Sequence, residues 1–175
     1  MSKPLTTRLV ADIGGTNSRL ALYDPGTDEF RSLHTYVNRE HGQFEDIVAA
    51  WFGALTESRP TECCLAVAAP PFEDRVTMLN IDWSFSLQAL AKRFDFSSLR
   101  CINDFEANAY ALPHLTEHDL TALQTGQTAQ GSKLATVGPG TGLGGATLSW
   151  VEGEPVVGDS EPGHMGLAPA SQLEL

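Results

Sequence analysis

One short pattern occurs twice in this chain, and it constrains the fold more than any other feature. Residues 134–141 align with residues 9–16 so that Leu, Gly and Thr fall at equivalent places. Each copy is an apolar run that ends in a Gly-Thr turn and is followed by a second apolar run, which is typical of a β-hairpin. The recurrence predicts a duplicated fold. We expect the second copy to have barely begun where the chain stops at Leu175, with roughly half of a two-lobed protein missing.

The remaining elements predict an α/β fold. Apolar residues at helical spacing indicate a helix over residues 44–55, and Ser86 is a plausible N-cap for another. The predicted order β-β-β-α-β-α-β-α fits one lobe of the actin-like ATPase (ribonuclease H-like) fold, with a mixed β-sheet flanked by helices, although this order alone also allows other α/β arrangements. The expected strands are residues 8–13, 18–23, 30–37, 63–69 and 99–102. The expected helices are residues 44–55, residues 86–94 and one that follows Asn103-Asp104 and is closed by Pro113.

The chain is expected to contain one small N-terminal α/β domain, residues 1–112, and the beginning of a larger domain, residues 113–175. The Thr-, Gln- and Gly-rich residues 116–132 are the natural connection between the two.

Charge and composition exclude several classes of partner. The formal net charge of −11 would repel a phosphate backbone or an anionic membrane, so neither nucleic acid nor membrane is expected to bind. The three cysteines cannot form a disulfide framework and lack the spacing of a zinc site, and no apolar run reaches the length of a signal peptide or a membrane span. These features predict a cytoplasmic protein.

The first glycine motif follows an apolar run and begins with a carboxylate. Its glycines let the backbone approach a phosphate and adopt positive φ, and its free N–H groups and threonine hydroxyl can donate to phosphate oxygens. The carboxylate of Asp12 could hold Mg²⁺, directly or through water. An ordinary hairpin turn is about equally plausible for this motif alone. The residues concerned are Asp12, Gly14, Gly15, Thr16 and Asn17.

A second glycine string joins the later pair of apolar runs. It contains Gly138, Gly140, Thr141 and Gly142, and it could contact phosphate or simply be a flexible loop between strands. A dinucleotide-binding motif is disfavoured because residues 144–150 are expected to form a strand rather than a helix. Two such turns facing each other from duplicated lobes would form a clamp on phosphates.

Polar residues follow one buried strand directly. Asn103 and Asp104 stand where a strand meets a helix, which is where α/β proteins present catalytic groups. Asp104 could accept the proton of an attacking hydroxyl while Asn103 binds a neighbouring hydroxyl. Asp104 could also be a helix N-cap, and the two roles are compatible.

Near the C-terminus, Glu161 and His164 stand three positions apart beside a glycine. Such a pair could hold two vicinal sugar hydroxyls, could ligate a metal, or could lie in an exposed loop; no further metal ligand stands nearby. Trp83 could stack on a sugar but is better explained as a core residue.

Five segments in order, DIGGTNSRLALYD, LNIDWSFS, INDFEANAYALP, VGPGTGLGGATL and EPGHMGLAP, resemble the bacterial glucokinase family. The resemblance implies that both glycine turns cradle the phosphates of ATP, with Mg²⁺ near Asp12. It further implies that Asp104 is the base that activates the 6-hydroxyl of glucose, while Asn103, Glu161 and His164 hold the other hydroxyls, with Gly140 and Thr141 close to both substrates.

The activity implied is transfer of the γ-phosphoryl group of ATP to glucose, in a homodimer. The family pattern E-G-G-H is changed here by Pro162, which removes a backbone N–H and fixes φ. No cysteine-rich zinc motif follows, so structural zinc is not expected. A non-catalytic sugar-binding regulator, an inactive fragment and an actin-like assembly module remain alternatives.

Overall fold

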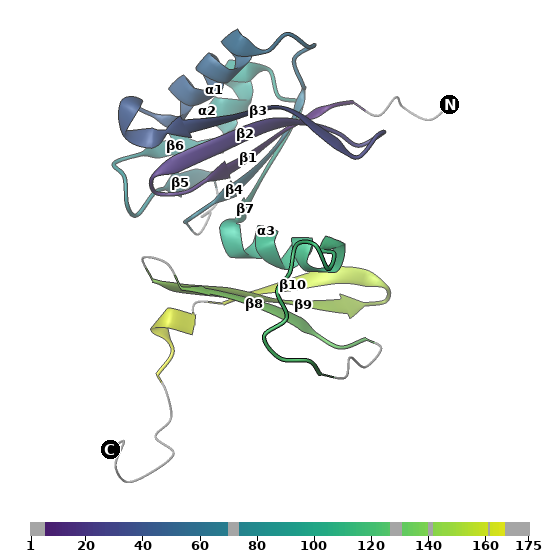
Figure 1. Cartoon of the computed structure of the whole chain (residues 1–175). Coiled ribbons are helices and arrows are strands. Elements are labelled where there is room, and N and C mark those ends of the chain that lie inside the picture. The colour runs from purple at the N-terminus through teal and green to yellow at the C-terminus, as the bar shows by residue number, and fades with distance from the viewer. Residues whose placement is uncertain (1–5, 70–73, 127–130, 140–141, 161, 167–175) are drawn as a thin grey trace. The chain divides into compact units, whose positions relative to one another are not determined.

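The computed structural model describes residues 6–69, 74–126, 131–139, 142–160 and 162–166. The chain divides into two compact units, Met1–Asp104 and Phe105–Leu175 (Figure 1). This division falls at the start of the helix α3 (Asp104–Ala111), and the domain boundary expected after residue 112 lies close to the end of the same helix. The expected boundary stays a prediction.

The first unit is built on a five-stranded mixed sheet with the strand order β3-β2-β1-β4-β7. The first three strands form an antiparallel meander, whereas β4 and β7 run parallel to β1. The mixed sheet and the helices packed on it confirm the predicted fold class. The strands are β1 (Arg8–Ile13), β2 (Asn17–Asp24), β3 (Glu29–Val37), β4 (Glu62–Val67) and β7 (Ser98–Asn103).

Alternation of side chains along these strands separates the core from the site. Leu9 and Ile13 of β1 are fully buried, whereas Asp12 between them is exposed, because successive side chains of a strand point to opposite faces. In β4, Leu65 and Val67 are likewise fully buried. One face of the sheet therefore forms the core, and Asp12 points away from it.

Two helices and a small hairpin complete this core. Apolar residues of α1 (Phe44–Ala54) and α2 (Leu87–Phe94) join the strands in one cluster, as the helical spacing predicted. The N-cap prediction is also confirmed, because the Ser86 hydroxyl accepts a hydrogen bond from the Ala89 N–H at 3.0 Å. Trp83 is a core residue, as expected, with only 4% of its surface exposed. The strands β5 (Arg75–Thr77) and β6 (Ser84–Ser86) were not expected, since three residues are too few to give a periodic signal.

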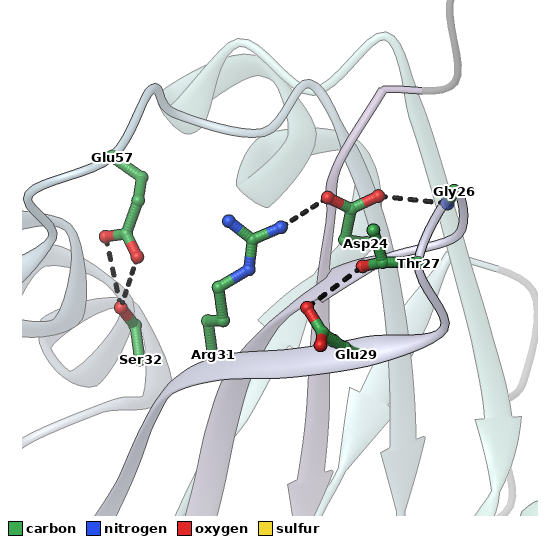
Figure 2. A network of polar contacts seen from close by, with 7 residues as sticks. All are labelled: Asp24, Gly26, Thr27, Glu29, Arg31, Ser32 and Glu57. Carbon is green, nitrogen blue, oxygen red and sulfur yellow. Dashed lines mark hydrogen bonds and ion pairs between the residues drawn. The ribbon is translucent and has the colours of Figure 1, made fainter.

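The outer hairpin of the sheet is held by polar contacts near its turn (Figure 2). Arg31 pairs with the Asp24 carboxylate, which also accepts the Gly26 N–H at 2.9 Å. Ser32 adopts a left-handed φ of 50° beside a register shift in the β2–β3 pairing. Its hydroxyl donates to Glu57, and its carbonyl accepts the indole N–H of Trp51 at 2.9 Å. The irregularity in β3 is thus tied to α1.

The second unit repeats the meander of the first. Its sheet has the order β10-β9-β8 with antiparallel neighbours, which matches the order β3-β2-β1. Apolar residues of α3 pack on this sheet, with Ala109, Ala146 and Leu148 buried. The repeated sequence pattern therefore corresponds to a repeated topology. The elements are α3 (Asp104–Ala111), η2 (Leu112–His114), β8 (Leu134–Pro139), β9 (Leu143–Val151), β10 (Glu154–Ser160) and η3 (Pro162–His164).

Candidate functional site

Strand register brings two of the predicted motifs to one edge of the first sheet. Ile13 of β1 pairs with Val67 of β4, and Val67 pairs with Asn103 of β7. The Ala68 N–H also donates to the Ile13 carbonyl at 3.0 Å, so the two strands stay paired up to their ends. Neighbouring strands lie about 4.8 Å apart, so the ends of β1 and β7 are separated by about 10 Å. The first glycine turn and Asn103 therefore leave the same edge of the sheet.

The first glycine turn is a short hairpin connection between β1 and β2. The Gly14 N–H donates to the Asn17 carbonyl at 3.0 Å, with Gly15 and Thr16 between them. Neither glycine has a left-handed φ, so the positive φ expected at the sequence level is not used. The close approach of Asn80 explains why residue 15 is a glycine, because a Cβ at Gly15 would lie 3.0 Å from the Cβ of Asn80. The hydroxyl-bearing Thr16 is exposed.

A buried asparagine that the sequence analysis missed supports this turn. The side-chain amide of Asn38 donates to the Gly14 carbonyl at 2.8 Å, and its backbone N–H donates to the Thr16 carbonyl at 2.9 Å. Its Oδ1 accepts the Ser18 hydroxyl at 2.8 Å, and both side chains are fully buried. No local pattern marks Asn38, which follows β3 and opens the short helix η1 (Asn38–Glu40).

Asp12 has a partner across the hairpin. Its Oδ2 lies 2.9 Å from Nη1 of Arg19, the residue opposite it in β2, and the two side chains are 50% and 59% exposed. An exposed pair of this kind is worth about 0–1 kcal/mol, so it does not prevent the carboxylate from exchanging partners. One accessible carboxylate fits a Mg²⁺ ion that is held largely by substrate phosphates and water. Among the described residues no group of three or more His, Cys, Asp and Glu could hold a metal alone.

Asn103 and Asp104 stand at the junction of β7 and α3. Asn103 is half-buried, and its side-chain amide donates to the Val67 carbonyl at 3.4 Å. Asp104 is the first residue of α3, so its carboxylate belongs to the first helical turn, where backbone N–H groups favour negative charge. The transition from strand to helix was predicted at this point. The catalytic role of Asp104 stays a prediction.

The second glycine string lies in the second unit, and two of its neighbouring glycines have a packing role. Gly138 of β8 pairs with Gly144 of β9. A Cβ at Gly138 would lie 2.7 Å from the Phe105 ring, and one at Gly144 would lie 2.0 Å from it. The missing side chains therefore make room for this ring. Gly142 is described and has no such neighbour within 4 Å, whereas the predicted contacts Gly140 and Thr141 lie outside the described residues.

The predicted sugar-binding segment packs on the start of β9. Its short helix η3 begins at Pro162, the residue that departs from the family pattern, and a Cβ at Gly145 would lie 3.1 Å from the Pro162 ring. Gly163 approaches Leu143 so closely that a Cβ there would lie 3.0 Å from the Leu143 carbonyl oxygen. Glu161 lies outside the described residues. The backbone of His164 belongs to η3.

In the part of the chain that the structure describes, no helix is long and apolar enough to cross a membrane.

Several known proteins that are similar to this chain are described as glucokinases. The Glucokinase family model matches residues 9–175. A glucokinase from Chromohalobacter salexigens is 38% identical over 166 residues, which cover 95% of this chain and 52% of that protein. A glucokinase from Nitrobacter hamburgensis is 36% identical over 176 residues, covering 99% and 54% of the two chains. This chain thus spans about half the length of these two curated relatives.

Solved structures agree with the sequence relatives. A crystal structure of a glucokinase from an Antarctic psychrotroph has a TM-score of 0.82 and 36% identity, covering 97% of this chain and 54% of that one. A glucokinase from Balamuthia mandrillaris in complex with glucose has a TM-score of 0.74 at 24% identity, covering 96% and 51%, which supports the fold alone. Because the family model matches nearly the whole sequence and the fold agrees with it, this chain belongs to the glucokinase family.

Proposed function

We propose that the complete protein carrying this chain transfers the γ-phosphoryl group of ATP to the 6-hydroxyl of glucose. One observation carries most of the support. The ends of β1, β4 and β7 are in register, so a phosphate-type glycine turn and the Asn103–Asp104 pair leave one edge of one sheet. A separation of about 10 Å between the outer two strand ends leaves room for the phosphate groups and an attacking hydroxyl.

Asp104 is proposed as the general base. In phosphoryl transfer the protein contributes mainly positioning and charge stabilisation, together with removal of one proton from the nucleophile. The Asp104 carboxylate would accept the proton of the sugar 6-hydroxyl as the hydroxyl oxygen forms a bond to the γ-phosphorus. The bond between that phosphorus and the β–γ bridging oxygen breaks, and ADP leaves. Asn103 would hold a neighbouring hydroxyl. Because Asn103 ends β7 and Asp104 begins α3, both groups are carried by regular elements rather than by a loop.

The glycine turns and Asp12 are proposed to hold ATP, the phosphoryl donor. Backbone N–H groups of Gly15, Thr16 and Asn17 would donate to phosphate oxygens, and the exposed Thr16 hydroxyl would add another donor. Mg²⁺ supplies charge neutralisation on the phosphates when it is bound, and the Asp12 carboxylate would hold it in exchange for Arg19.

The remaining predicted contacts belong to the second unit. Gly138, Gly140, Thr141 and Gly142 would contact the phosphates from the second turn, with Gly140 and Thr141 also near the sugar. Two further sugar contacts are proposed, Glu161 and His164. A homodimer in the cytoplasm is part of the same proposal, and sedimentation of the complete protein tests its oligomeric state.

The decisive experiment replaces Asp104 by Asn in the complete protein. Loss of the base should lower kcat by a factor of about 10²–10⁴ in an assay that couples ADP release to glucose addition, while the Kd for glucose changes by less than about threefold. Asp95→Asn is the matched control. It makes the same chemical change at an exposed left-handed C-cap, where asparagine is well tolerated, and should leave kcat unchanged.

The outcomes separate the alternatives. Turnover of the Asp104→Asn variant within about twofold of the natural protein would remove Asp104 as the base. Natural protein that binds glucose but releases no ADP would instead be a sugar-binding regulator. Natural protein that binds neither glucose nor ATP would contradict the whole proposal.

A further inference from the structure

Asn38 is a buried polar residue of the first unit, and the mechanism above gives it no role. Asn38 and Ser18 are the buried polar residues in the described part of the chain, and both are 0% exposed. Three hydrogen bonds of 2.8–2.9 Å link Asn38 to Ser18 and to two carbonyls of the first glycine turn. A buried polar group satisfied in this way is costly to disturb, since its partners would lose their bonds away from water.

The two carbonyls that Asn38 holds determine where the turn's N–H groups point. No described peptide bond is cis. In a planar trans peptide the N–H of one residue points opposite to the C=O of the residue before it. Because the Gly14 and Thr16 carbonyls point toward Asn38, the N–H groups of Gly15 and Asn17 point away from it. These are two of the groups proposed to receive phosphate.

Ser18 sets the orientation of the Asn38 amide. A side-chain amide has a donor end and an acceptor end, and exchanging them would present an oxygen to the Gly14 carbonyl. The Ser18 hydroxyl donates to Oδ1, which leaves Nδ2 facing Gly14. In this series of hydrogen bonds, Ser18 therefore donates to Asn38, and Asn38 donates to the Gly14 carbonyl.

We propose that Asn38 is a positioning residue that presets the first glycine turn for the phosphates of the nucleotide, without touching the nucleotide itself. This inference rests on the proposed function and extends it. A turn whose peptide planes are held before binding loses less conformational freedom when the phosphates arrive, so its affinity for them is higher. Asn38 should therefore matter for ATP and ADP and leave the affinity for glucose unchanged.

The test uses Asn38→Asp in the complete protein. Aspartate has the same shape and keeps an acceptor for Ser18, but its ionised form cannot donate to the Gly14 carbonyl. At pH 8 we expect the KM for ATP and the Kd for ADP to rise about tenfold, as expected for loss of one buried hydrogen bond. The Kd for glucose, measured by calorimetry, should stay within about twofold.

Measuring the Kd for ADP of the Asn38→Asp variant over a series of pH values separates positioning of the turn from a purely structural role. A purely structural role would not make this Kd depend on pH. Burial raises the pKa of a carboxyl group, and a protonated carboxyl can donate to the Gly14 carbonyl as the amide does. The ratio of the ADP Kd of Asn38→Asp to that of the natural protein should therefore fall toward one as the pH is lowered from 8 to 6.

Trp51→Phe is the control for general destabilisation. It removes a hydrogen bond of the same kind, from a side-chain N–H to the Ser32 carbonyl at 2.9 Å, within the same unit. We expect a lower Tm with the ratio of ATP KM to glucose KM unchanged. Should Asn38→Asp fail to fold, Ser18→Ala is the second variant. It keeps Asn38 but removes the hydroxyl that fixes the orientation of the Asn38 amide, and it should raise the Kd for ADP about threefold.

The outcomes distinguish failure of the role of Asn38 from failure of the kinase proposal. An unchanged ADP Kd in Asn38→Asp, or equal losses for ADP and glucose, overturns the role of Asn38 while leaving the kinase proposal intact. Natural protein that binds ADP but shows no glucose-dependent turnover overturns the kinase proposal, and the ADP Kd values of the variants still decide the role of Asn38. Natural protein that binds no nucleotide overturns both.

Discussion

At the scale of single residues, two glycines around the second turn have a packing role, which is separate from the phosphate contact predicted for Gly138. Gly138 and Gly144 face each other on β8 and β9, and the Phe105 ring occupies the space where their side chains would stand. Phe105 directly follows Asp104, the proposed base. The start of α3 is thus anchored on the two strands that flank the second glycine turn.

This packing makes Gly144 intolerant of even one methyl group. The Cβ of Gly144→Ala would lie 2.0 Å from the Phe105 ring, so the ring must move. We expect a loss of about 1–3 kcal/mol in the free energy of unfolding, as for overpacked cores. Urea denaturation followed by circular dichroism measures it.

The matched control is Gly142→Ala, where a Cβ meets nothing within 4 Å. It should change the free energy of unfolding by less than about 0.5 kcal/mol. A Phe105→Ala background should also abolish the penalty of Gly144→Ala, because the two changes share one contact. Equal effects of both alanines, or a penalty that persists without Phe105, would contradict the packing explanation.

At the scale of elements, α2 begins at a two-residue polar cap. The Ser86 hydroxyl accepts the Ala89 N–H, as an N-cap does, and donates to Asp74 at 2.5 Å. Asp74 also accepts the Gln88 N–H at 2.8 Å. These bonds, the Ser86 hydroxyl first, lower the pKa of Asp74 below its ordinary value of 3.8. Sequence alone identified Ser86, whereas Asp74 reaches the cap only through the folded chain.

The cap should make stability depend on pH in acid. Because folding lowers the pKa of Asp74, its ionised form stabilises the fold above pH 3.8, and this contribution is lost as the pH falls further. Asp74→Asn should lower the Tm at pH 7, and the difference from the natural sequence should shrink below about pH 4. Asp95→Asn, at the other end of α2, is the control and should not lower the Tm at pH 7. A Tm difference for Asp74→Asn that is the same at pH 7 and pH 3.5 would contradict this account.

At the scale of the whole molecule, the two units have unequal cores. Strands and helices of the first unit share one large buried cluster, including Trp51, Phe44 and Leu65. Among the described residues of the second unit, the buried part of the core is Ala109, Ala146 and Leu148. Since buried apolar area supplies most of the stability of a fold, the second unit should be the less stable of the two.

Hydrogen exchange of this 175-residue chain tests that inequality. Amides of β1, β4 and α1 should exchange at least about tenfold more slowly than amides of β8, β9 and β10, because local opening costs less free energy where fewer side chains are buried. Mass spectrometry of peptides after timed deuteration measures this. The β1–β2 and β8–β9 hairpins form a matched pair with the same topology, so slower exchange in β8–β9 would contradict the prediction.

Much of the local structure was predictable because neighbouring residues determine it. Apolar spacing predicted α1, a glycine turn between apolar runs predicted the β1–β2 hairpin, and the repeated pattern predicted the second hairpin, β8–β9, although not the third strand, β10. Hydrophobic periodicity and turn chemistry act over a few residues, so they can be read without knowing the rest of the fold. The polar pair Asn103–Asp104 was placed at a strand-to-helix junction by the same reasoning.

Only the tertiary structure decided which of these pieces meet. The parallel pairing of β1, β4 and β7 sets Ile13 and Asn103 at one sheet edge, although ninety positions separate them. The burial of Asn38 beneath the first turn and the place of Phe105 over two glycines are likewise contacts between distant segments. Such pairings are selected by packing of the whole core, which no local pattern encodes.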